Sequence, residues 1–431
     1  MITDTPDQSF RRVAPAVKPM TAFTLPEVRR RMLPSGIELL IYNRCDVPCN
    51  SLTFVMPGGS CEMGPLAYSS LISVMRNEGT RTFPGDEINS RLDFNGSWLK
   101  CTTSAHHTSI EMRSLNKRLA DTLPVFRSVI LEPTMPEDIL AVRREALASR
   151  LEVAMSDVDF LASCKFSELA AGKNHPEALV DNPDDVRTVS SDILLGLIER
   201  CETPSRGKLF LCGMITPDIE ELVAATFSDI PRGDDHGIKI IPYTPAPAGT
   251  VEKVVRPDAS QSAVMMMLPG VKRGHPDQIP LHITVSALGG YFGSRLMLNI
   301  RERLGLTYGI SASLNSSANG SYIQIMADTA CDSVDRLRAE VARELERMSV
   351  DPPRGEELSR LRQTLLSQQA AIVDNPFSIM AYYAGSITAD IPNGYFDAKL
   401  RAIEALTPDT LAETAARYLR PEFLRTAIAG A

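Results

Sequence analysis

The sequence predicts an α+β protein of two similar domains, each with a mostly antiparallel sheet packed against helices. Strand-like and helix-like segments follow one another in a mixed order, without the regular strand–helix alternation of a parallel sheet. The order of segments in the second half repeats that of the first at an offset of roughly 210 to 220 residues. A stretch with four prolines and three glycines, residues 231–250, separates the halves and is the expected linker.

Residues 1–25 are polar and without periodicity, so we expect an N-terminal extension ahead of a first domain at residues 26–230. Strands are predicted where apolar residues alternate up to a turn, and helices where they recur every three to four residues. Pro124 lies inside one helical run and predicts a kink or a break. In chain order the expected elements are strands at Gly36–Tyr42 and Ser51–Gly59, helices at Leu66–Met75 and around Ile88–Leu92, strand structure over Trp98–Met112, helices at Leu119–Ile130, from Pro136 toward Val153 and after Ser190, a strand at Lys208–Gly213 and a helix at Pro217–Phe227.

The second domain is expected at residues 251–431 because the same signals return in the same order. A strand ending at Pro269-Gly270 mirrors the one ending at Pro57-Gly58. An amphipathic helix from Val334 to Met348, a pair of prolines and a further helix repeat the helix–proline–helix order that follows Leu119. Two copies of one fold explain this recurrence.

Composition excludes several classes of function. The formal charge is −8 and no basic cluster is present, which argues against nucleic acid, because phosphate binding relies on grouped Lys and Arg. No apolar run is long enough to cross a bilayer, and residues 1–17 lack the apolar core of a secretory signal, so we expect a cytoplasmic protein, or a periplasmic one if a leader was removed. Of the eight cysteines only Cys45 and Cys49 are close in sequence. They could form half of a metal site, but without a second pair free thiols are expected.

The stretch Leu288–Gly309 is the one around which the chain is organised. Gly289 and Gly290 give a flexible segment at which backbone can approach closely. Apolar residues then recur on one helix face until Gly305, where the helix should end and a strand begin. The pattern predicts a glycine-rich loop, a helix, a turn and a strand.

Arg301 on this helix and Tyr308 on the strand are seven residues apart and could point out of one surface. The run resembles "LGGGFSSRLFQELREKLGLAYSV" of the pitrilysin-type (M16) zinc peptidases. In that family an Arg and a Tyr at these positions help to hold the substrate peptide backbone near the metal. The resemblance therefore assigns substrate binding to Arg301 and Tyr308, with Gly289 and Gly290 ahead of them. Taken singly, each side chain also fits a helix-surface ion pair or a half-buried strand aromatic.

The catalytic motif of the family is missing. Active members carry HxxEH on an early helix, where two His on one face bind zinc and the Glu activates the bound water. Gly79-Thr80 resembles the Gly-Thr that follows the motif, and counting back from it places Ser70 and Val74 at the His positions and Ser73 at the Glu position. None of the six histidines lies in HxxEH or its reverse. No zinc site is therefore expected on this chain.

Other candidate ligands have simpler interpretations. Glu145 and Glu152 resemble the distal glutamates of the family, the second of which supplies the third zinc ligand, but without the histidines we expect two surface helix acids. His106 and His107 are adjacent on an expected strand and should point to opposite faces. His175 is expected to cap a loop or, with Lys173, to border a shared chamber.

The resemblance implies a catalytically silent subunit, inactive alone, which would hold a peptide while an HxxEH-bearing partner supplies the zinc. A homodimer is the other assembly considered. The alternative function is a structural or peptide-binding scaffold without a role in proteolysis. A hydrolase with a Ser or Cys nucleophile is disfavoured, since no Gly-x-Ser-x-Gly motif occurs.

Overall fold

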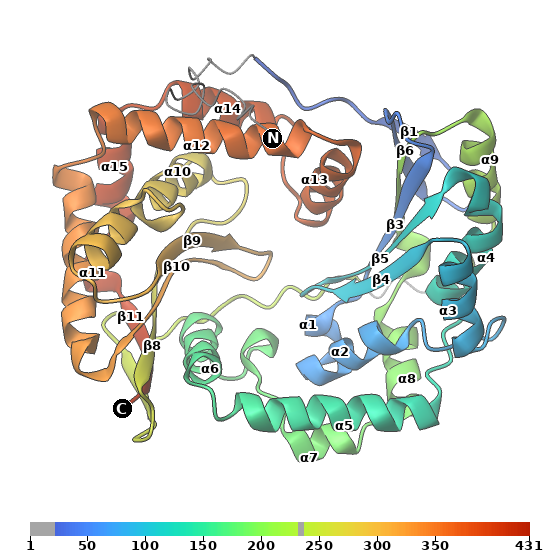
Figure 1. Ribbon diagram of the computed structural model, residues 1–431, viewed down its shortest axis with the longest axis horizontal. Helices are drawn as coiled ribbons and strands as arrows, with labels where there is room; N and C mark the ends of the chain where they lie inside the picture. Colours follow the sequence, from blue (N-terminus) through green and yellow to red (C-terminus); the bar gives the residue numbers. More distant parts are fainter. Residues whose placement is uncertain (1–21, 232–236) are drawn as a thin grey trace, which may run out of the picture.

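The computed structural model describes residues 22–231 and 237–431, and its strands form two sheets, one from each half of the chain (Figure 1). The predicted extension up to residue 21 and linker residues 232–236 lie outside the described residues. The first sheet contains β1 (Arg29–Met32), β2 (Glu38–Asn43), β3 (Cys49–Pro57), β4 (Trp98–Thr103), β5 (His107–Leu115) and β6 (Lys208–Gly213). The second contains β7 (Val251–Val255), β8 (Gln261–Pro269), β9 (Ile310–Ser316), β10 (Ser321–Ala330) and β11 (Arg425–Gly430).

The two sheets have the same topology apart from β1. Their strand orders are β1-β2-β6-β3-β5-β4 and β7-β11-β8-β10-β9. In each sheet one pair is parallel, β2 with β6 and β7 with β11, and every other pair is antiparallel. This confirms the prediction of two copies of an α+β fold with mostly antiparallel sheets.

Helices follow the strands in a matching order in the two halves. The first half contains α1 (Ser60–Met63), α2 (Leu66–Met75), α3 (Gly85–Phe94), α4 (Leu119–Leu131), α5 (Glu137–Ala154), α6 (Val158–Ala171), α7 (Pro183–Arg187), α8 (Ser191–Cys201) and α9 (Pro217–Thr226). The second contains α10 (Gln278–Gly289), the π-helix η5 (Met297–Arg303), α11 (Val334–Val350), α12 (Gly355–Val373), α13 (Pro376–Thr388), α14 (Tyr395–Glu404) and α15 (Pro408–Tyr418). Short 3-10 turns are η2 (Asn116–Arg118), η3 (Pro176–Ala178), η4 (Pro204–Arg206), η6 (Cys331–Ser333) and η7 (Pro421–Phe423).

Most predicted elements are confirmed, and α2 has the predicted bounds. The break expected at Pro124 does not occur, because α4 runs through this residue. Proline removes one backbone donor from the helix. Buried apolar neighbours on both sides, Leu123, Val125 and Phe126, each no more than 1% exposed, anchor the helix against the sheet despite that loss.

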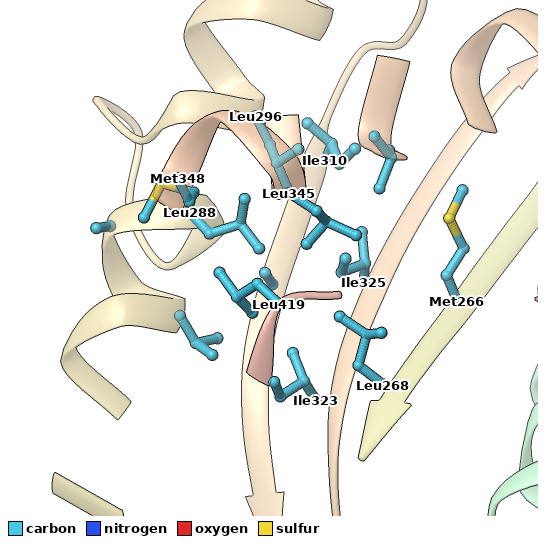
Figure 2. Close-up of a cluster of buried hydrophobic side chains, with 14 of the residues drawn as sticks. Met266, Leu268, Leu288, Leu296, Ile310, Ile323, Ile325, Leu345, Met348 and Leu419 are labelled. Atoms are coloured by element: carbon cyan, nitrogen blue, oxygen red, sulfur yellow. The ribbon is translucent and has the colours of Figure 1, made fainter. Parts of the chain in front are cut away.

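One face of each sheet packs against helices of its own half. In the second half, side chains of β8 and β10 meet α10, η5 and α11 in a core that includes Met266, Ile325 and Leu345 (Figure 2). Leu288 and Leu296, on either side of the glycine pair, belong to the same core (Figure 2). The first part of the stretch singled out in the sequence is therefore anchored in the core.

The other face of each sheet is covered by a helix of the opposite half (Figure 1). Helix α6 packs Phe166 against Met265 and Met267 of β8 in the second sheet. In exchange, α13 packs Ile379 and Met380 against strands β2, β3 and β6 of the first sheet. The two helices occupy equivalent places in the repeat, so the halves are held together by a reciprocal exchange. No helix within the described ranges is long and apolar enough to cross a membrane.

Candidate functional site

Arg301 and Tyr308 lie on either side of a tightly constrained turn. The π-helix η5 ends as Leu304 N–H donates to the carbonyl of Asn299 at 3.0 Å, and Gly305 follows at φ 60°. A positive φ strains most residues but not glycine, which confirms the predicted helix stop. The next carbonyl, that of Leu306, accepts a 2.6 Å hydrogen bond from the hydroxyl of Thr329 on β10. Strand β9 begins at Ile310, so Tyr308 precedes it and is not part of it, contrary to the prediction.

The two side chains are in contact with each other. The guanidinium carbon of Arg301 lies 5.2 Å from the ring centre of Tyr308 and 4.8 Å from that of Phe292. Tyr308 is 90% exposed, and the hydroxyl of the preceding Thr307 bonds both the N–H and the carbonyl of Gly309, which fixes the backbone on both sides of the ring. Arg301 also forms a 3.5 Å ion pair with Glu302. The expectation that both residues point out of one surface agrees with this geometry.

The glycine pair has a packing role. Gly289 is the buried last residue of α10, so the predicted flexible loop does not begin there. A Cβ on Gly289 would lie 2.5 Å from the backbone nitrogen of Ala312 on β9, and one on Gly290 would lie 2.6 Å from Cα of Ser286. No side chain fits at such distances, so Gly289 allows α10 to lie directly against β9, and Gly290 allows the chain to turn closely over the end of α10. The predicted close approach of backbone is thus found inside the domain.

A small cavity of about 310 Å³ adjoins this turn. Its walls are mainly apolar, with Met297 and Ile310 on the side of the turn. Asp159 of α6 and Asp328 of β10 also line it. Burial and the hydrogen bond and charge of Asp159 raise the pKa of Asp328 to about 6. Asp328 is therefore protonated at a higher pH than a free aspartate.

The positions that correspond to HxxEH lie on α2 and do not form a metal site. Ser70 and Val74 are exposed, and the hydroxyl of Ser73 is 2.8 Å from that of Thr103 on β4. Valine has no donor atom, and neutral hydroxyls are weak ligands for zinc. Within residues 22–231 and 237–431 no group of three or more His, Cys, Asp or Glu is arranged to hold a metal ion.

The two glutamates of α5 are paired with a cation of the chain itself. Arg187 of α7 donates to Glu145 at 3.1 Å and to Glu152 at 2.7 Å, and also contacts Asp184 at 3.2 Å. Hydrogen bonds from Arg187 are the main reason that the pKa of Glu145 lies below its usual value. The carboxylates are thus on the surface, as predicted, but they are paired with one guanidinium. The residues present do not fit a zinc ion.

Comparison with known proteins gives a consistent result. Residues 188–365 match the family described as Peptidase M16 inactive domain. An uncharacterized zinc protease of Rickettsia bellii is 22% identical over 343 residues, which cover 78% of this chain and 81% of that protein. A Helicobacter pylori protein described as "Non-peptidase homolog YmxG" is 25% identical over 66% of each chain. The crystal structure of a peptidase M16 inactive domain from Pseudomonas fluorescens matches with a TM-score of 0.83 at 21% identity, covering 94% of this chain and 98% of that one.

The chain resembles the M16 peptidase family, because residues 188–365 match its inactive domain and the whole fold matches that of solved M16 structures. Two of the candidate histidines, His175 and His106, have structural partners. His175 caps η3, with Nδ1 accepting from the N–H of Glu177 at 3.1 Å and Nε2 2.9 Å from the carbonyl of Ile241, which agrees with the loop-capping interpretation. His106 lies in the turn before β5, where the expected alternation of faces does not apply. Its Nδ1 is 2.7 Å from Glu62, and this hydrogen bond raises the pKa of His106. His236 lies outside the described residues.

Sequence reasoning missed a polar network that joins the halves of this chain to the linker. Glu177 accepts hydrogen bonds from Asn319, at 2.6 Å, and from the hydroxyl of Tyr243, at 2.8 Å. The amide oxygen of Asn319 accepts from the N–H of Ile241. No local pattern around Glu177 indicates this junction. The partners of Glu177 are 66 and 142 residues away in the chain.

Proposed function

We propose that this chain is the non-catalytic, peptide-holding subunit of a heterodimeric zinc metalloendopeptidase, whose partner carries HxxEH and the zinc. One observation carries the proposal. Arg301 and Tyr308 are in contact at the surface, with Tyr308 90% exposed, whereas the metal positions hold Ser70, Ser73 and Val74. Gripping a peptide and hydrolysing it are separate tasks, which can be placed on opposite walls of one assembly.

The proposed ligand is an extended, unfolded peptide. Arg301 would donate from its guanidinium to a peptide carbonyl, and the exposed hydroxyl of Tyr308 would bond the same backbone. Strand β9, which begins two residues later, is an edge strand of the second sheet, so a peptide can add to it by main-chain hydrogen bonds. Such binding depends on backbone groups and gives broad sequence specificity.

The proposal includes an assembly and a location. We place the domains at residues 26–230 and 251–431 with a linker at 231–250, and we place the protein in the cytoplasm. The partner is an M16 chain of similar length with HxxEH, or else a second copy of this chain. Nucleic acid is not among the proposed partners, in keeping with the charge of −8.

The test uses the purified chain with and without its partner, captured from native lysate. Alone, the chain should hydrolyse no unstructured peptide and should retain no stoichiometric zinc in elemental analysis. With the partner, Arg301→Ala and Tyr308→Ala should each lower peptide turnover at least tenfold and leave the complex intact on gel filtration. Arg303→Ala, on the same helix, is the matched control. One zinc per isolated chain would disprove the proposal.

A scaffold function without proteolysis is the second candidate, and the "Non-peptidase homolog" description of the Helicobacter pylori relative favours it. The scaffold function and the peptide-holding function differ in one expected outcome. As a scaffold, the chain would assemble with its partner, but Arg301→Ala and Tyr308→Ala would leave peptide turnover unchanged.

A further inference from the structure

The site contains an aromatic residue that has no assigned role. Phe292 lies in the turn between α10 and η5, and its ring centre is 4.8 Å from the guanidinium carbon of Arg301. It is 64% exposed, so this ring is not held by burial in a core. Exposed aromatic surface has a hydration cost, and the contact with the cation offsets part of it.

The cation is the sheltered member of a group of three. The side chain of Arg301 is 27% exposed, although the two rings that contact it are 64% and 90% exposed. A free arginine samples many rotamers, and ordering it costs about 2 kcal/mol of side-chain entropy. A guanidinium in contact with two rings has lost that freedom before any ligand arrives. The N–H groups of Arg301 lie in the plane of the guanidinium, so they remain available for hydrogen bonds at its edge.

The neighbouring arginine on the same helix is held differently. Arg303 donates from Nε to the side-chain oxygen of Asn299 at 2.9 Å, and Asn299 in turn donates to the buried Glu344 at 2.6 Å. Arg303 therefore belongs to a polar network of the domain. Arg301 has aromatic contacts on the surface and one ion pair, with Glu302, which is 49% exposed and contributes little.

We propose that Phe292 is a positioning residue, which holds Arg301 with its N–H edge directed at a planar acceptor, the backbone carbonyl of a bound peptide. This inference rests on the proposed peptide-holding function. The role of Phe292 is preorganisation: its ring orders the guanidinium but forms no hydrogen bond to the peptide. Aromatic replacements should therefore keep the function, and aliphatic ones should not.

The first measurement needs no ligand and does not depend on the proposed function. The Nε–Hε resonance of Arg301, assigned from its loss in Arg301→Lys, is recorded by NMR in the isolated chain. Phe292→Leu and Phe292→Ala should remove the ring-current shift of this resonance, and Phe292→Tyr should retain it. Phe423→Ala is the matched control, because Phe423 makes the same contact with Arg420, at 4.7 Å, elsewhere on the surface.

The second measurement is the affinity for a fluorescein-labelled, unstructured 20-residue peptide, by anisotropy. Phe292→Ala should weaken binding two- to fivefold, which corresponds to about 0.5–1 kcal/mol. Phe292→Tyr and Phe423→Ala should bind as the unmodified chain does. The inference is overturned if the Arg301 resonance is unchanged in both Phe292→Leu and Phe292→Ala. It is also overturned if Phe292→Ala leaves the affinity unchanged although Arg301→Ala weakens binding. If Arg301→Ala also leaves affinity unchanged while the resonance shifts, the proposed function fails and the ring contact stands.

Discussion

Arg76, the residue that follows α2, offers the sharpest test of how the degenerate helix is held in place. Its side chain is fully buried and pairs with Glu202, whose side chain is 1% exposed. It also donates to the carbonyls of Val129 and Ile130 on α4, at 3.3 and 3.5 Å. Burial raises the pKa of Glu202, and the charge and hydrogen bond of Arg76 oppose that rise. The pair joins α2 to α4 and to the segment before β6.

Arg76→Met should destabilise the fold by about 3–5 kcal/mol, because it leaves the Glu202 carboxylate buried without its counter-ion. That is a large part of the roughly 5–15 kcal/mol by which a domain is stable. For a domain of this size, the unfolding temperature should fall by about 10 °C. The double variant Arg76→Met/Glu202→Met replaces the pair with apolar groups and should recover most of the loss.

The assay is thermal unfolding followed by circular dichroism at pH 7 and pH 5. Without Arg76 the raised pKa of Glu202 dominates, and stability tied to a raised carboxyl pKa is present at low pH and lost as pH rises. The deficit of Arg76→Met should therefore be smaller at pH 5 than at pH 7. Arg143→Ala, which removes a solvent-exposed pair with Glu78, is the control and should cost at most about 1 kcal/mol. If Arg76→Met loses no more than Arg143→Ala, the reasoning is refuted.

Two further predictions concern the junction of the halves. The pKa of Asp328, raised to about 6, means that stability falls as pH rises from about 4 through 6. Asp328→Asn should reduce this change in the free energy of unfolding by about 1 kcal/mol, a value that allows for solvent screening. The measurement is the denaturation midpoint as a function of pH, and an unaltered slope would contradict the prediction. Ile379→Ala on α13 should cost about 2–5 kcal/mol and speed hydrogen exchange in β2 and β6, although it lies in the other half. Val350→Ala, at a 78% exposed position, is the control. Faster hydrogen exchange confined to the second half would argue against the packing of α13 on the first sheet.

Much of the fold could be predicted because its signals are local. Helix α2 and strand β6 have the predicted bounds, since alternation or helical spacing within a few residues decides them. Gly305 was identified as a helix stop from its position after an apolar stripe, and its φ of 60° gives the physical reason. The repeat of the two halves was visible because each half carries its own complete set of these signals.

Other features followed from contacts that no window of sequence contains. Nothing near Glu145 and Glu152 indicates that Arg187, 42 and 35 residues away, pairs with both. The contact of Phe292 with Arg301 depends on a π-helical turn, which the 3.6-residue spacing of the apolar residues does not reveal.

The amino-acid sequence alone determined the elements of this protein, its internal repeat, its family resemblance and the loss of HxxEH. Only the tertiary structure decided that α6 and α13 exchange sheets, that one guanidinium pairs with the two glutamates, and that two aromatic rings contact Arg301. Local conformation depends on residues a few positions apart, which the sequence displays directly. Which distant surfaces meet depends on the combined burial and loop closure of the whole chain.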